Sequence, residues 1–167
     1  FLARPLRLHF WIDGELFRIH HMGITNHLLI AAPSEAEEIL ASEEPSLTWD
    51  GFSCRGLNTI NLATLWALAE TGSADDGVER RLDAIRTLPE GDEGPWVDIV
   101  PPTMLAALAA IATMEDQEQE ALAVRWGKTE EMDGWDASEV VDAVRSIGDT
   151  AESALLENKT LLIWTSL

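Results

Sequence analysis

The pattern of apolar and polar positions is most regular in the last third of the chain. From Val140 to Ala154, apolar residues recur at spacings of three and four, which places them on one face of a helix. Asp136 is a favourable N-cap, and Glu139 stands where its carboxylate reaches back to the amide of the cap. Residues 160–165 then carry no charge on either alternating face, as in a strand covered on both sides. The pattern therefore predicts a long capped helix that leads into a central strand.

Shorter segments upstream show the same two periodicities. Apolar stretches bounded by turn residues predict strands at residues 24–32 and 96–100, and a further extended segment at 47–54. Apolar positions at helical spacing predict five more helices, with start or stop signals of the usual kinds. These are a short helix from the capping box Ser34 to Glu37, a helix over 62–70 capped by Asn61 and closed by Gly72, a helix from Val78 to Pro89 with Arg80, Arg81 and Arg86 facing outward, an alanine-rich helix after Pro101 and Pro102, and a helix with an acidic start that ends near Gly127.

Residues 1–21 differ in composition from the rest of the chain. They hold three of the four histidines, and Met22 is the first methionine. Three interpretations fit: a tag, translation upstream of a natural start at Met22, or a β-hairpin with strands at 8–12 and 16–19. No cysteine or acidic residue accompanies the histidines at a metal-ligand spacing, so no metal site is predicted.

Residues 22–167 are predicted to form a single α+β domain. The chain has 167 residues, of which 46% are hydrophobic, and this is enough for one core. We expect a small mixed or antiparallel sheet packed against several helices, with the C-terminal strand at its centre.

Charge and cysteine content narrow the class of function. Thirty acidic and eleven basic residues give a formal net charge of −19, which opposes binding to phosphate backbones and attracts a basic protein. No apolar run approaches the roughly 20 residues of a membrane span. The single cysteine, Cys54, cannot form an internal disulfide, and in a strand it is more often a small core residue than a nucleophile. We therefore expect a cytoplasmic protein that binds neither membranes nor nucleic acid and carries no cofactor.

One segment between predicted helices, residues 126–136, is the candidate site. The segment holds two tryptophans, four acidic residues and one of the two lysines of the chain. If the aromatic side chains anchor the segment, its carboxylates form a fixed cluster of negative charge. The residues assigned to the site are Trp126, Lys128, Thr129, Glu130, Glu131, Asp133 and Trp135.

Two functions fit this segment. The preferred hypothesis is an acidic protein-binding module for a basic partner, as an immunity or antitoxin-like protein would be. The alternative is a small enzyme in which Glu130, Glu131 and Asp133 work as acid and base in a cleft walled by Trp126 and Trp135. A concave pocket with converging carboxylates favours the enzyme, whereas a broad, flat or convex acidic face favours the binding module.

Three segments also carry a resemblance to known proteins. Trp96-Val97 precedes the alanine-rich helix, residues 123–131 read Ala-Val-Arg-Trp-Gly-Lys-Thr-Glu-Glu, and residues 161–167 form an apolar end. In this order they resemble small uncharacterised bacterial proteins, and they are distantly similar to the YfbM-like family of unknown function. The resemblance spans about residues 22–167 and implies a single α+β domain. It implies no activity, substrate or catalytic residue.

Overall fold

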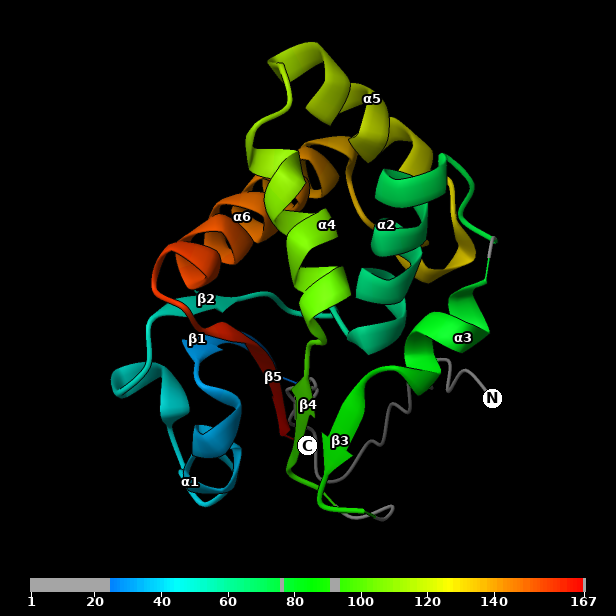
Figure 1. Cartoon of the computed structure of the whole chain (residues 1–167). Helices are drawn as coiled ribbons and strands as arrows, with labels where there is room; N and C mark the ends of the chain where they lie inside the picture. Colours follow the sequence, from blue (N-terminus) through cyan, green and yellow to red (C-terminus); the bar gives the residue numbers. More distant parts are fainter. Residues whose placement is uncertain (1–24, 76, 91–93, 167) are drawn as a thin grey trace, which may run out of the picture.

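The computed structural model describes residues 25–75, 77–90 and 94–166, and these form an α+β domain built on one sheet (Figure 1). The strands are β1 (Thr25–Ala31), β2 (Gly51–Ser53), β3 (Arg86–Leu88), β4 (Trp96–Ile99) and β5 (Thr160–Ser166). Their order is β2-β1-β5-β4-β3, and every pairing in the described part is antiparallel. The predicted α+β class is confirmed. The hairpin predicted at 8–19 lies outside the described residues.

The C-terminal strand β5 lies at the centre of the sheet, as predicted. Strand β1 pairs with it along seven residues, with Leu28 opposite Ile163, and β4 pairs along its other edge. Leu161 and Ile163 face the larger core, whereas Leu162 and Trp164 face a smaller core on the other side of the sheet. Both faces of β5 are covered, which is why the segment carries no charge.

Helices cover the two faces unequally. The described helices are α1 (Ala36–Leu40), α2 (Thr59–Thr71), α3 (Val78–Asp83), α4 (Pro102–Ala112), α5 (Asp116–Trp126) and α6 (Ala137–Leu156). Figure 1 shows α2, α4, α5 and α6 gathered on one side of the sheet, with α1 on the other side. Ile39 of α1 and the half-buried Trp49 belong to the smaller core. None of the described helices is both long and apolar enough to cross a membrane.

The longest helix, α6, packs closely on α4. Its predicted apolar face is buried, and the amide of Asp136 donates to the Glu139 carboxylate at 2.9 Å, as in the predicted capping box. A Cβ built on Gly148 would lie 3.0 Å from the amide nitrogen of Ala112, so a side chain there would push the helices apart. This packing fixes the position of α6, whose N-terminal end follows the candidate site.

Two predicted helix starts are wrong by a few residues. Helix α2 begins at Thr59 and is capped by Asn58, whose side chain accepts from the amides of Ile60 and Asn61. Asn61 is therefore the third helical residue and not the cap. Before α1, the Glu35 carboxylate accepts from the amide of Ala32 at 2.6 Å. Pro33 starts a 3-10 turn there, so one half of a capping box forms two residues earlier than the box predicted from Ser34 to Glu37, and the other half is missing because alanine has no side-chain acceptor.

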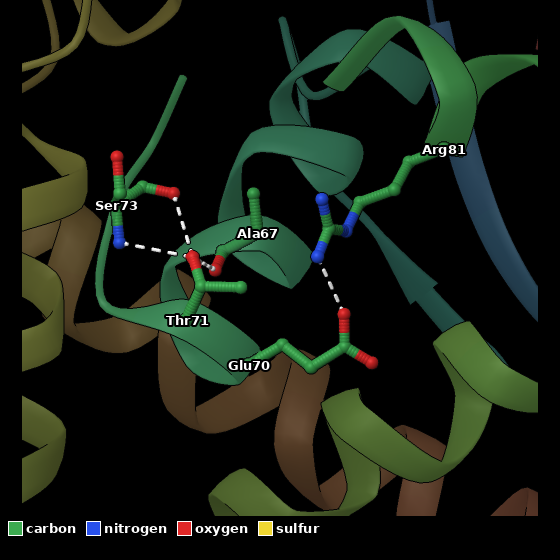
Figure 2. Close-up of polar contacts among 5 residues, drawn as sticks. All are labelled: Ala67, Glu70, Thr71, Ser73 and Arg81. Carbon is green, nitrogen blue, oxygen red and sulfur yellow. Dashed lines mark hydrogen bonds and ion pairs between the residues drawn. The ribbon is translucent and has the colours of Figure 1, made fainter. Parts of the chain in front are cut away.

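The helix predicted from Val78 to Pro89 is also wrong in part. Helix α3 ends at Asp83, and β3 takes the rest of the segment to the edge of the sheet. Arg81, predicted to face outward, is buried. Its guanidinium bonds to the Glu70 carboxylate at 2.5 Å (Figure 2). The guanidinium also lies over the Trp66 ring, so a partner charge and an aromatic face compensate its burial.

The C-terminal end of α2 follows the prediction. Gly72 takes a left-handed conformation with φ of 76°, and its amide donates to the carbonyl of Leu68. Beside it, the Thr71 hydroxyl donates to the carbonyl of Ala67 at 2.9 Å and accepts from the amide of Ser73 (Figure 2). A turn of this kind leads the chain out of the helix without orphaned backbone groups.

Candidate functional site

Trp126 anchors the candidate segment from inside the core. It is the last residue of α5, its side chain is 0% exposed, and its indole Nε1 donates to the backbone carbonyl of Asn61 at 3.1 Å. The predicted anchoring role therefore fits its position. The position does not fit a wall of an active-site cleft, because a fully buried indole presents no surface to a ligand.

Asn61 holds the turn that carries the acidic residues. Its side-chain nitrogen donates to the carbonyl of Glu131 at 2.8 Å, and its side-chain oxygen accepts from the amide of Asn58. Met132, only 1% exposed, sits in the main core beside it. This role of Asn61 was not predicted from the sequence. The signal was present, because two asparagines three residues apart fit an N-cap and the third helical position equally well.

The acidic residues lie on a 3-10 turn, η3 (Glu130–Met132), and just after it. Within it, the amide of Met132 donates to the carbonyl of Thr129 at 3.2 Å, and the amide of Asp133 donates to the carbonyl of Glu130 at 3.2 Å. Glu130 and Asp133 are exposed, and Glu131 is half-buried. None of these three carboxylates forms an ion pair with another described residue. The turn thus presents three carboxylates that have no ion-pair partner among the described residues.

A polar cavity of about 450 Å³ opens beside the turn. The hydroxyl of Thr64 donates to the carbonyl of Ile60, and the hydroxyl of Thr129 donates to the carbonyl of Trp126, so each offers the cavity only acceptor lone pairs. Three carboxylates, of Asp75, Glu130 and Glu131, and two cations, of Arg125 and Lys128, also line it, so its wall is net negative. The lining consists of Thr64, Ala74, Asp75, Arg125, Lys128, Thr129, Glu130 and Glu131.

A second hollow, of about 350 Å³, lies between α5 and the first turns of α6. Apolar side chains dominate its wall, and Val124 there is 56% exposed. Lys128 lines both hollows, so the two adjoin at this residue. The lining consists of Glu120, Ala123, Val124, Gly127, Lys128, Trp135, Ala137, Val140 and Val141.

The predicted site residues therefore do not share one location. Trp126 lies in the core, and Asp133 lines neither hollow. Thr129, Glu130 and Glu131 line the polar cavity, Trp135 lines the apolar hollow, and Lys128 lines both. Neither of these two hollows brings together the three carboxylates of the enzyme hypothesis.

Two nucleophile candidates lie elsewhere. Burial raises the pKa of the Cys54 thiol, and the nearby Glu139 carboxylate adds to this, so the reactive thiolate is disfavoured. On the sheet, the Ser53 hydroxyl lies 2.5 Å from Nδ1 of His27, whose pKa is lowered by burial. Among the described hydrogen bonds, no carboxylate orients this imidazole, as a nucleophile and base pair needs. No group of three or more described His, Cys, Asp and Glu side chains is placed to hold a metal ion.

Comparison with known proteins finds one distant structural likeness. No family model matches the chain, and no curated protein matches it. Among solved structures, the fold is similar to that of YfbM from Escherichia coli, a protein of unknown function. The identity is 10% and the TM-score is 0.44, over 86% of this chain and 99% of YfbM. The predicted distant similarity to YfbM is thus confirmed, and no function comes with it.

Proposed function

We propose that this chain is an acidic protein-binding module for a basic protein partner, of the kind that immunity and antitoxin proteins represent. One observation carries the proposal: the exposed carboxylates of Glu130 and Asp133 stand on a turn that Asn61 and Trp126 tie to the core. A fixed cluster of charge loses little conformational entropy when a partner binds.

Charge supports the same function. A net charge of −19 attracts a basic partner over distances comparable to the Debye length, about 8 Å at physiological salt. The cluster on η3 then gives the encounter a preferred place and orientation. A nucleic acid is not the partner we propose, because its phosphates are repelled by this surface. A reducing cytoplasm fits the single cysteine and is the compartment we propose.

The enzyme alternative finds less support in the geometry. It needs Glu130, Glu131 and Asp133 to converge in a cleft between two tryptophans. Trp126 is buried, Trp135 lines the apolar hollow, and Asp133 lines neither hollow. Acid and base groups must lie within hydrogen-bond reach of one reacting centre. The arrangement therefore favours binding over catalysis.

Capture of the partner tests the proposal. Wild-type protein on a resin is exposed to lysate of the source cells, beside Glu130→Lys/Glu131→Lys. The matched control is Glu37→Lys/Glu38→Lys, which makes the same charge change at exposed positions of α1, on the opposite side of the sheet. We expect wild type and control to retain the same basic protein and the loop variant to lose it. Equal retention by all three would remove η3 as the binding site.

A further inference from the structure

The apolar hollow between α5 and α6 stays unfilled because several of the residues that line it are small. Its floor and sides include Ala123, Gly127 and Ala137, residues too small to fill the space between the two helices. Val124 stands at its edge with 56% of its surface exposed, among the few exposed large apolar residues of the described chain. The hollow is therefore apolar surface in contact with solvent, which favours occupation by another apolar group.

The size of the hollow suits one side chain of a partner. Its volume of about 350 Å³ lies in the range of ligand pockets, roughly 300–1,000 Å³. A dry cavity of about 150 Å³ already accepts benzene. A leucine, methionine or phenylalanine side chain therefore fits, and protein interfaces commonly centre on such an anchor in a pocket with a polar rim.

The polar cavity, which adjoins the apolar hollow at Lys128, accepts a different group. There the polar cavity presents the carboxylates of Glu130 and Glu131, together with the acceptor lone pairs of Thr64 and Thr129. Arg125 and Lys128 also line this cavity, and the Nε of Arg125 is directed to the carbonyl of Ala121 on its own helix. With Asp75, Glu130 and Glu131 as its acids, the lining holds three negative and two positive side chains and so remains net negative. An ammonium or guanidinium group complements this wall.

From these two adjoining hollows we infer that the partner carries an apolar anchor residue beside a lysine or arginine, and that the apolar hollow takes the anchor while Glu130 and Glu131 take the cation. The inference rests on the proposed function and specifies its partner. Electrostatic attraction brings the basic segment to η3, and insertion of the anchor then sets its lifetime there.

Two short synthetic peptides serve as probes. Both carry lysine and arginine on each side of one central position, which is leucine in the first and serine in the second. Binding is followed by methyl NMR of the full chain, with the methyl groups of Val124, Val140 and Val141 as reporters. We expect the leucine peptide to bind about tenfold more tightly than the serine peptide, as burial of one such side chain predicts, and to shift these methyl signals.

Variants that leave the net charge unchanged separate the contribution of the apolar hollow to binding from that of the charged residues. Val124→Gln removes apolar surface at an exposed position of α5 without changing the net charge, and Leu156→Gln makes a comparable change at the far end of α6, where Leu156 is 79% exposed. We expect Val124→Gln to abolish the preference for leucine and Leu156→Gln to preserve it. The serine peptide is expected to bind both variants as it binds wild type.

The outcomes separate the two proposals. If both peptides bind equally and the valine methyl signals do not move, the anchor inference is overturned while binding at η3 stands. The same holds if Val124→Gln keeps the preference for leucine. If neither peptide binds, or if Glu130→Lys/Glu131→Lys binds both as well as Glu37→Lys/Glu38→Lys does, the proposed function fails and the inference fails with it.

Discussion

The indole Nε1 of Trp126 donates a hydrogen bond of 3.1 Å to the backbone carbonyl of Asn61. This bond joins the last residue of α5 to the first turn of α2. The side chain of Asn61 in turn donates to the carbonyl of Glu131, so one asparagine links the buried tryptophan to the acidic turn. The same two residues therefore stabilise the core and hold the acidic turn, and substitution of Trp126 or Asn61 is expected to affect both the stability of the fold and the order of the turn.

Truncation of Trp126 should be strongly destabilising. Trp126→Ala removes a fully buried aromatic side chain and is expected to lower the free energy of unfolding by about 3–5 kcal/mol. Trp126→Phe keeps most of the volume but removes the indole donor to the Asn61 carbonyl, which keeps its place in the hydrogen-bond ladder of α2, and is expected to cost about 0.5–1.5 kcal/mol. Urea titration measures both. A cost below about 1 kcal/mol for the alanine variant would contradict the assigned anchoring role.

Loss of the Asn61 side chain should loosen the acidic turn in particular. Asn61→Ala removes the donor to Glu131 and is expected to cost about 1–3 kcal/mol. Amide hydrogen exchange should accelerate at Met132 and Asp133. The matched control is Asn58→Ala, which removes the cap of α2 at about 1 kcal/mol but leaves the contact to the turn in place. Equal exchange rates at the turn in the two variants would show that Asn61 does not hold it.

The central strand offers a test of the core. Ile163→Ala should cost about 2–5 kcal/mol, because Ile163 is fully buried and paired on both sides. Leu156→Ala, at an exposed position, should change the free energy of unfolding by less than about 0.5 kcal/mol. Denaturant titrations of the two variants give the comparison. Similar small costs would mean that the terminal strand does not contribute to the core.

The Glu70–Arg81 pair predicts a dependence of stability on pH. The hydrogen bond from Arg81 holds the pKa of the Glu70 carboxyl below its ordinary value of 4.5. Because the folded-state pKa is the lower one, ionised Glu70 stabilises the fold above about pH 4.5, and this contribution is lost as the pH falls through the folded-state pKa.

Comparison of wild type with Glu70→Gln measures this contribution. At neutral pH the variant should be less stable by on the order of 1 kcal/mol, a value kept small because the Glu70 side chain is 45% exposed to screening solvent. The difference should shrink steadily in denaturant titrations taken between pH 6 and about pH 3. A gap that stays constant over this range would show that ionisation of Glu70 plays no part.

Periodicity predicted the elements that pack on one continuous core. Helix α6 was predicted because the apolar positions from Val140 to Ala154 keep the spacing of one helix face throughout. Strand β5 was predicted because residues 160–165 carry no charge on either face. The central place of β5 followed from burial on both faces. The order of the other four strands depends on which segments pair with each other, and the pattern of apolar and polar residues does not determine this pairing.

Side-chain contacts between distant segments explain what the sequence did not predict. Arg81 reads as a surface residue of a short helix, yet Glu70 and Trp66 of α2 make its burial tolerable. Asn61 reads as a cap, yet it faces a turn about seventy residues later in the chain. The candidate segment itself was located from its tryptophans and acids, whereas the hollow between α5 and α6 arises only when Val124 and Val141 are brought together.

The most direct measurement of the central claim is the association rate of the captured basic partner at low and at physiological salt. It compares wild type, Glu130→Lys/Glu131→Lys and Glu37→Lys/Glu38→Lys, after urea titration has shown that all three fold equally well. A cluster on η3 that steers the partner predicts slower association and a flatter salt dependence for the loop variant than for the α1 variant. Identical rates and identical salt dependence in the two variants would contradict the account, because the attraction would then come from net charge alone.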